Sequence, residues 1–433
     1  MGNKLKILFI ILGILTLIAL FTLRLEGQIL EILPARALVI EVTNPPSLAE
    51  SIPTWTFTEK IEEARQLVAS ASLELKVSKK DHVYYENRIT RDSRGRIRVA
   101  QKRLTDPERE IALVIMDLIT GDLDLIKITE KGNNLTVPPG YEIENVTRPN
   151  GITNNAWNTC RRVITPENKA IILNVWPHYV NERVPRVSKN KRGKTITTHQ
   201  TIERIDNRVY GPYCEEVHVA EFVQSGVDRR KSIPRQAMDI LRERGVMSRA
   251  FPDKLIADVE HLRLEYFEGL SLIEHMDYGE FLLDPRKSAE RVDVILGMNG
   301  ENGYRFTCSR AGACGWVQYT KRTWNAIDSK YPAVQLPAFE TGAPDHLYSM
   351  IAAILLFDNN LDSAIKKFGL SILNNSDLLG EMLFANFNGG TVRPYGALKA
   401  SILKSLEDWL TNPMRTETQQ YIEKWRYVRS DYQ

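Results

Sequence analysis

The sequence lacks several features that mark common classes of protein. Lysine and arginine (57) nearly balance aspartate and glutamate (54), so the formal net charge is only +3 and gives no reason to expect nucleic acid as a partner. Internal repeats and low-complexity linkers are absent, and the stretch FNGGTV lacks the lysine and the preceding strand of a phosphate-binding loop. What remains is an ordinary globular composition, 43% hydrophobic, over 433 residues, a length that predicts about two to three domains.

Cysteine is scarce, and its four positions are Cys160, Cys214, Cys308 and Cys314. An even number of cysteines in an oxidising compartment predicts two disulfide bonds. Four cysteines allow three pairings, and the sequence alone does not choose among them. Proximity along the chain favours a bond between Cys308 and Cys314.

The competing interpretation of the cysteines is a metal site. Cys214 and His218 are four positions apart in CEEVH, which on a helix would place both side chains on one face. One such pair is a weak signal, because no other cysteine or histidine repeats a ligand spacing. We therefore expect no metal and no cofactor.

One long hydrophobic run stands at the N-terminus, from Ile7 to Leu23. A helix of about 17 residues just crosses a bilayer core, and Lys4 and Lys6 before it hold the N-terminus in the cytoplasm. A cleavable signal peptide would end in small residues, but this run ends in TLRLEGQ. The pattern predicts an uncleaved signal anchor in residues 1–25, with the rest of the chain outside the cytoplasm. A cleaved signal peptide and a buried core helix are the alternatives.

The segment from residue 26 to residue 230 has a mixed texture. Proline and glycine clusters such as NPPS and VPPG interrupt stretches of strand-forming residues. The stretches expected to be extended are Leu113–Thr129 with a turn at Thr120–Asp122, Lys169–Val180, Lys194–Ile205 and Glu215–Val223. The segment is therefore predicted to be an α+β domain, and its role is unknown.

Six positive charges lie between Arg183 and Lys194, in the stretch RVPRVSKNKRGK. A functional interpretation is contact with an anionic wall polymer or lipid. The other interpretation is a solvated hairpin tip, which needs no partner, and the sequence favours it.

From about residue 231 the pattern becomes helical. In His346–Leu361, apolar residues recur at the three-and-four spacing of an amphipathic helix. We expect a helical connector over residues 231–286 and a mainly α domain over residues 287–433. The predicted fold class is therefore multidomain, with an N-terminal transmembrane helix, an α+β middle region and a mainly α C-terminal domain.

One acidic residue stands before a tight loop in the stretch ENGYRFTCSRAGACGWVQYT, residues 301–320. The preceding stretch, residues 289–300, has the periodicity of a helix, so Glu301 is expected at or just past a helix C-terminus. The negative end of a helix dipole and partial burial both raise the pKa of a carboxyl group. A raised pKa is what a general acid requires near neutral pH. A solvated glutamate in a glycine-rich turn is the alternative.

Three motifs in chain order resemble those of the soluble lytic transglycosylases, the goose-lysozyme-like glycosidases that cut peptidoglycan. The first motif, E-N-G-Y followed by S-R-A-G-A-C-G-W-V-Q, begins at Glu301. The second is F-A-N-F-N-G-G from Phe384, and the third is R-T-E-T-Q-Q-Y-I from Arg415. The resemblance covers residues 287–428 and implies a lysozyme-like helical catalytic domain. It does not extend to residues 26–230.

The first motif implies roles for three residues. Glu301 matches the catalytic acid of the family, and Ser309 and Gln318 match residues that line the cleft around the cleaved sugars. The motif departs from the family at Asn302, where serine is usual, and at Trp316 and Val317, where leucine and methionine are usual. The flanking cysteines are not part of the family motif, and a bond between them is expected to position Ser309.

The second and third motifs imply four further site residues. Phe387 and Asn388 match a pair that contacts the sugar and the catalytic carboxylate, although Phe387 lacks the hydroxyl of the tyrosine usual in the family. Tyr421 matches a tyrosine whose hydroxyl approaches that carboxylate. Glu417 matches an acid that supports this arrangement.

The implied reaction needs one carboxyl group, as in the substrate-assisted glycosidases. The acid protonates the leaving glycosidic oxygen while the N-acetyl group of the muramic acid residue acts as internal nucleophile. The carboxylate then deprotonates the C6 hydroxyl, and a 1,6-anhydro ring closes without water. The predicted function is a murein lytic transglycosylase that cleaves the MurNAc–GlcNAc β-1,4 bond. The alternatives are a lysozyme-type muramidase on the same scaffold and a non-catalytic peptidoglycan-binding envelope protein.

The expected partners follow from this function. Peptidoglycan glycan strands are the substrate, the membrane holds the N-terminal helix, and residues 26–230 are a candidate docking region for other envelope proteins. The expected location is the periplasmic face of the bacterial inner membrane.

Overall fold

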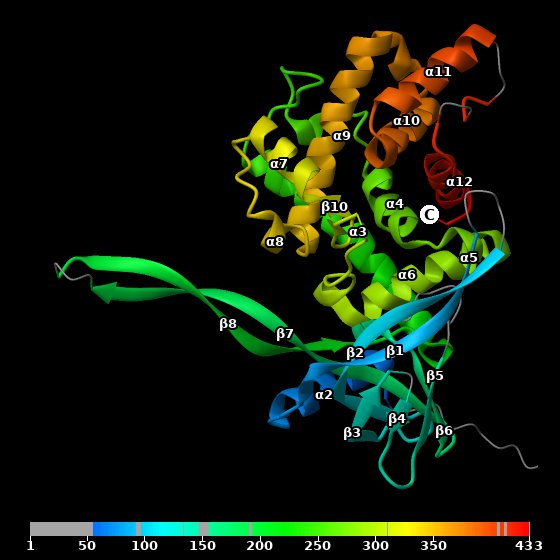
Figure 1. Cartoon of the computed structure of the whole chain (residues 1–433). Helices are drawn as coiled ribbons and strands as arrows, with labels where there is room; N and C mark the ends of the chain where they lie inside the picture. The colour runs from blue at the N-terminus through cyan, green and yellow to red at the C-terminus, as the bar shows by residue number, and fades with distance from the viewer. Residues whose placement is uncertain are drawn as a thin grey trace, which may run out of the picture. The chain divides into compact units, whose positions relative to one another are not determined.

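The computed structural model describes residues 55–91, 97–132, 134–146, 156–189, 193–309, 311–404, 408–410 and 414–432 (Figure 1). The predicted signal anchor, residues 1–25, lies outside these residues. Within the described part of the chain, no helix is both long enough and apolar enough to cross a membrane. The described residues form one compact unit.

Strands dominate the chain up to Tyr210, and helices dominate the rest. The first part contains α2 (Phe57–Ser70), β1 (Val77–Arg91), β2 (Ile97–Asp117), β3 (Leu123–Lys131), β4 (Asn134–Thr136), β5 (Glu142–Asn145), the 3₁₀ turn η2 (Ala156–Asn158), β6 (Arg161–Thr165), β7 (Lys169–Lys189) and β8 (Thr195–Tyr210). The second part contains η3 (Glu215–Val217), α3 (Ala220–Glu243), η4 (Ile256–Asp258), α4 (Leu264–His275), α5 (Tyr278–Leu283), α6 (Pro285–Asn299), η5 (Gly300–Asn302), β9 (Ala313–Cys314), β10 (Tyr319–Thr320), α7 (Lys321–Lys330), α8 (Phe339–Gly342), α9 (His346–Phe368), η6 (Leu370–Asn374), α10 (Ser376–Gly389), α11 (Val392–Lys404) and α12 (Thr416–Asp431).

The long strands form an antiparallel sheet in the order β4-β3-β2-β7-β8, with β1 paired to the first half of β2. The β1–β2 and β7–β8 pairs continue beyond the sheet as two-stranded ribbons (Figure 1). Between β2 and β3, the Asp117 carboxylate accepts hydrogen bonds from the N–H groups of Ile119 and Thr120 at 2.8 and 2.9 Å. Gly121 completes this turn at a φ of 78°, which glycine adopts without strain. The predicted strand, turn and strand over Leu113–Thr129 are thereby confirmed.

Helices α3 and α6 pack with their backbones in direct contact. A Cβ atom on Gly226 would lie 1.9 Å from the carbonyl oxygen of Asp293, and one on Gly297 would lie 2.1 Å from that of Phe222. Only glycine therefore permits this approach at either position. Beside the contact, Arg230 Nε donates to the Asp293 carboxylate at 3.0 Å in a buried ion pair.

The predicted fold class, a multidomain chain with a transmembrane helix and separate α+β and mainly α parts, was wrong. One hydrophobic core includes Ile61 of α2, Ile172 of β7, Phe222 of α3 and Phe384 of α10, so the sheet and the helices share their buried surface. The result is a mixed helix and sheet structure, 51% helical, without a transmembrane helix in its described residues. The predicted domain boundaries after residues 230 and 286 fall inside α3 and α6.

The expected extended stretch Glu215–Val223 was also wrong, because η3 and the first turn of α3 occupy it. Its alternation of polar and apolar residues resembles a strand over a short window. The longer pattern is helical, since the buried residues Phe222, Gly226, Arg230 and Ile233 follow one another at spacings of a helical face.

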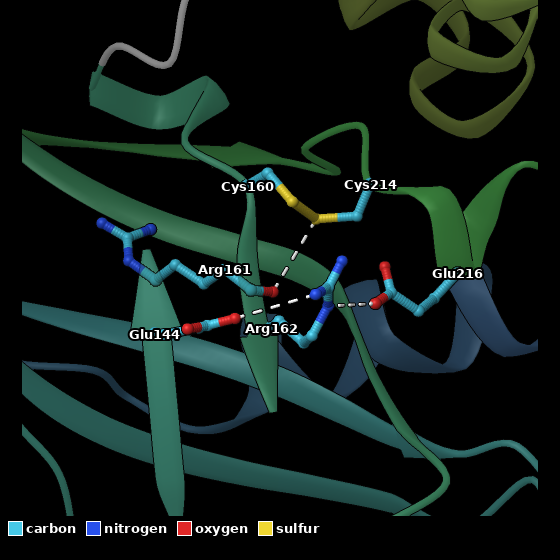
Figure 2. The surroundings of a disulfide bond; sticks show 6 residues. All are labelled: Glu144, Cys160, Arg161, Arg162, Cys214 and Glu216. Atoms are coloured by element: carbon cyan, nitrogen blue, oxygen red, sulfur yellow. Dashed lines mark hydrogen bonds and ion pairs between the residues drawn. A yellow bond between two sulfur atoms is a disulfide. The ribbon is translucent and has the colours of Figure 1, made fainter. Parts of the chain in front are cut away.

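Two disulfide bonds pair all four cysteines, Cys160 with Cys214 and Cys308 with Cys314. The pairing that proximity favours is confirmed. Figure 2 shows the first bond, which ties the start of β6 to the segment that leads into α3. Disulfide bonds are typical of proteins outside the cytoplasm, in agreement with the predicted extracytoplasmic location.

Candidate active site

A pocket of about 510 Å³ lies at the junction of α4 and α5, between α12 and the loop that follows α6. Several distant segments form its walls. They are Trp157 and Asn158 of η2, residues 273–278, Arg291 and Ile295 of α6, Tyr304, Thr307, Cys308, Ser309, Gln318, Asn388 of α10, and Glu417, Gln420, Tyr421 and Lys424 of α12.

Glu274, in the last turn of α4, is the central acid of this pocket. Tyr421 Oη donates a hydrogen bond to Glu274 Oε1 at 2.6 Å. Burial raises the pKa of Glu274 to about 7, while the Tyr421 hydrogen bond and the charge of Lys424 act in the opposite direction. Glu274 also lies at the C-terminal end of a helix, where the helix dipole disfavours a negative charge. Both effects favour a carboxyl group that keeps its proton near neutral pH.

Lys424 fixes the end of the helix that carries Glu274. Its buried Nζ donates to the backbone carbonyls of Ile273 and Met276, the second at 2.9 Å. Carbonyls in the last turn of a helix have no partner within the helix, so Lys424 supplies one. Burial lowers the pKa of Lys424 to about 8, and the Glu274 carboxylate opposes this shift.

The floor beneath Glu274 is a neutral aromatic stack. His275 stacks on Tyr304 with ring centroids 3.7 Å apart, and His275 Nε2 donates to the carbonyl of Trp316 at 2.7 Å. Burial lowers the pKa of His275 to about 3, so the imidazole is uncharged at neutral pH. His275 therefore positions the loop after α6 and adds no positive charge to the pocket.

The disulfide loop supplies Ser309, and the segment that follows the loop supplies Gln318. Ser309 Oγ accepts a hydrogen bond from the N–H of Ala313 at 3.1 Å, and Gln318 Nε2 donates to the carbonyl of Gly315 at 2.7 Å. Gly315 has a φ of 82°, and a Cβ atom there would lie 1.9 Å from the carbonyl oxygen of Ala343. This glycine is thus required for the close approach that places the loop beside the pocket.

Helices α10 and α12 supply the opposite wall. Asn388 Oδ1 accepts a hydrogen bond from Thr418 Oγ1 at 2.8 Å, and Glu417 lies beside it in the first turn of α12. Phe387, which the resemblance pairs with Asn388, does not line this pocket. It packs in the core instead, with its ring centroid 5.7 Å from Tyr319 and 5.8 Å from Phe357.

The structure brings together most of the predicted site residues, namely Ser309, Gln318, Asn388, Glu417 and Tyr421. It does not bring Glu301 to them. Glu301 lies just past the C-terminal end of α6, as expected, but its side chain is exposed in η5 and does not line the pocket.

Glu274 was missed by the sequence analysis. The signal was nevertheless present, because Glu274 falls on the same helical face as Phe267 and Leu270, which are both fully buried. A carboxyl group at an apolar position of a helix is a candidate for a raised pKa. The other two acids of the pocket, Asp277 and Glu417, are exposed, and Asp277 caps α5 by accepting from the N–H of Glu280.

The alternative metal interpretation has no support in the geometry. Cys214 is in a disulfide bond, and His218 accepts from Tyr213 Oη at 2.6 Å while it donates to the Glu290 carboxylate at 3.2 Å. Across the described residues, no group of three or more histidine, cysteine, aspartate or glutamate side chains is arranged to hold a metal ion.

Comparisons with protein-family models, with curated proteins and with solved structures found no match to this chain.

Proposed function

We propose that the chain is a peptidoglycan lytic transglycosylase and that Glu274 is its catalytic acid. The observation that carries the proposal is the Tyr421–Glu274 hydrogen bond in a pocket that Ser309, Gln318 and Asn388 also line. Tyr421, Ser309, Gln318 and Asn388 come from the three motifs that resemble the lytic transglycosylase family, whereas Glu274 lies before the first of them. The acid is moved from Glu301 to Glu274, because among the acids that line the pocket Glu274 alone combines partial burial with the contact to Tyr421.

The mechanism uses the one carboxyl group twice. Glu274 donates its proton to the glycosidic oxygen, and the C1–O4 bond breaks as the N-acetyl oxygen of the same sugar bonds to C1. The Glu274 carboxylate then accepts the proton of the C6 hydroxyl, whose oxygen displaces the N-acetyl oxygen from C1. The products are a 1,6-anhydro sugar and a free 4-hydroxyl end, and the acid regains its proton.

The location that fits this substrate is the bacterial periplasm, with glycan strands of peptidoglycan as the partner. The two disulfide bonds support an oxidising compartment. The proposal does not depend on residues 1–25. A lysozyme-type muramidase is distinguished from it by product chemistry, since water in place of the C6 hydroxyl gives reducing ends.

Digestion of purified sacculi, followed by mass analysis of the sugar ends, tests the proposal. The wild-type protein is expected to release anhydro-ended muropeptides. Glu274→Gln is expected to lower the rate by roughly 10³-fold, the range of general acid catalysis. Glu301→Gln is the matched control, because it makes the same change at an exposed glutamate and is expected to retain activity. Loss of activity in Glu301→Gln with full activity in Glu274→Gln would overturn the assignment.

A further inference from the structure

One wall of the pocket comes from the strand-rich part of the chain, far from the segment that resembles the transglycosylases. Trp157 and Asn158 belong to η2, which lies between β5 and β6 in the strand-rich part of the chain. The side chains that face them in the same pocket belong to the helical part. The sheet therefore contributes directly to the cavity that holds Glu274.

Trp157 is held in a fixed position by its neighbours. The guanidinium carbon of Arg208 lies 4.5 Å from the centroid of the Trp157 ring, and Phe306 contacts the indole edge-to-face at 5.8 Å. The backbone carbonyl of Trp157 accepts a hydrogen bond from Asn174 Nδ2 of β7 at 2.9 Å. With these contacts Trp157 is still half-buried rather than fully buried, and it lines the pocket.

Two polar atoms on the pocket lining have no hydrogen-bond partner among the described residues. They are Asn158 Oδ1 and Tyr304 Oη, and both atoms are shielded from solvent by protein. Buried polar groups are nearly always paired in folded proteins. Both oxygens are closed to solvent, so the polar group of this wall that remains free to pair with a ligand is the Asn158 Nδ2 amide, since Asn158 is only half-buried.

The disulfide bond between Cys160 and Cys214 anchors this wall. Cys160 follows Asn158 by two residues, and its bond crosses to the segment before α3. Next to the bond, the Arg162 guanidinium pairs with Glu216 at 3.0 Å and with Glu144 at 3.7 Å, so the start of β6 is held from both sides (Figure 2). Because this wall is ordered before a ligand arrives, binding does not have to overcome the entropy cost of ordering it.

We propose that Trp157 and Asn158 form an additional sugar subsite, which binds an N-acetylated aminosugar ring of a β-1,4-linked glycan and which the Cys160–Cys214 bond holds in place. An indole ring presents a flat apolar surface that suits the C–H face of a pyranose. The amide Nδ2 of Asn158 can donate to a hydroxyl or acetamido oxygen of the same ring. The subsite rests on the proposed function, and it would extend the contact between the enzyme and the glycan beyond the cleaved bond.

Binding of chitopentaose, a β-1,4-linked N-acetylglucosamine oligomer, to the full chain carrying Glu274→Gln tests the subsite, with calorimetry as the readout. On that background, Trp157→Ala is expected to weaken binding by about tenfold, the loss of roughly one good aromatic contact. Trp157→Phe is expected to keep most of the affinity, and Asn158→Ala to lose severalfold. Trp55→Ala is the matched control, since Trp55 is a half-buried tryptophan of the same part of the chain that does not line the pocket.

Different outcomes separate the two proposals. If the Glu274→Gln variant without further substitutions binds no oligosaccharide, and the wild type cleaves no peptidoglycan, the proposed function fails. If the oligomer binds and Trp157→Ala binds it as tightly as Trp55→Ala does, the subsite is overturned while the function stands. A folded Cys160→Ser, Cys214→Ser variant is expected to weaken binding as Trp157→Ala does, with a higher KM and a nearly unchanged kcat when Glu274 is intact. Unchanged affinity in that variant contradicts the anchoring role of the bond.

Discussion

Tyr421 and Glu274 lie 147 positions apart in the sequence, yet Tyr421 Oη donates a hydrogen bond to Glu274 Oε1 at 2.6 Å. The contact joins α12 to the C-terminal turn of α4 across the pocket. Burial alone would raise the pKa of Glu274 further, but the hydrogen bond and the nearby Lys424 charge stabilise the carboxylate and hold the pKa near 7. The acid can therefore both give up and regain a proton near neutral pH.

The first prediction concerns the pH dependence of the reaction. The proposed mechanism starts from protonated Glu274, whose pKa is about 7, so kcat/KM is expected to fall as the pH rises through this value. Well above the pKa, the decline should approach about tenfold per pH unit. Initial rates on a soluble glycan across the neutral range measure it. A rate that stays constant well above pH 7 would exclude Glu274 as the acid.

Tyr421→Phe tests the hydrogen bond itself. The hydroxyl stabilises the carboxylate form, so its removal is expected to raise the pKa of Glu274 and to move the alkaline limb of the profile to higher pH. The rate at the optimum should fall by about tenfold or more, because a hydrogen bond to a charged group contributes about 1.5–3 kcal/mol.

Tyr395→Phe is the control for this change. Tyr395 is a buried tyrosine outside the pocket, and its hydroxyl bonds to the carbonyl of Asn360 and the amide of Asn386. It should lose stability without any shift of the pH profile. Equal profiles for Tyr421→Phe and the wild type would contradict a role of Tyr421 in setting the pKa of Glu274.

Lys424 is expected to act on Glu274 through both its charge and its hydrogen bonds. Lys424→Met removes the positive charge, so the pKa of Glu274 should rise and the alkaline limb should again move to higher pH. It also leaves the carbonyls of Ile273 and Met276 without this donor, at a cost of about 1–3 kcal/mol per buried group in the free energy of unfolding.

Lys424→Gln separates these two effects, because it keeps a donor group but removes the charge. It should reproduce the pH shift of Lys424→Met with a smaller loss of stability. The measurements are pH–rate profiles and urea unfolding at fixed pH. A pH profile that neither substitution moves would limit Lys424 to a structural role.

Local signals in the sequence predicted much of the fold. The turn after Asp117 and the long helix beginning at His346 follow from residue type and periodicity within a short window. Sheet order and the shared core depend on contacts between distant residues, such as Ile61 with the later helices, and no short window contains them. The alternating stretch at Glu215–Val223 was misread for the same reason.

Sequence motifs located part of the pocket lining, but they missed Glu274 and wrongly placed Phe387 there. Ser309, Gln318, Asn388 and Tyr421 were expected in one cleft, and the pocket contains all four. The acid was sought just before the disulfide loop, where Glu301 stands. The chain places α5 and α6 between Glu274 and that loop, so proximity in sequence pointed to Glu301, which does not line the pocket. The buried helical face of Phe267 and Leu270 points instead to Glu274, which does.

The two disulfide bonds are expected to differ in what their removal costs. The Cys160–Cys214 bond closes a separation of 54 residues and the Cys308–Cys314 bond one of 6 residues, so replacement of each pair by serine should lower the free energy of unfolding by about 4 and about 2 kcal/mol, respectively, on the chain-entropy scale. The effects on activity should have the opposite order. The shorter loop carries Ser309 beside the pocket, so removal of the Cys308–Cys314 bond should lower kcat while the protein stays folded. Urea unfolding without reductant and steady-state kinetics on both variants provide the measurements. If the Cys308→Ser, Cys314→Ser variant turned over glycan at the wild-type rate, the short bond would have no part in positioning Ser309.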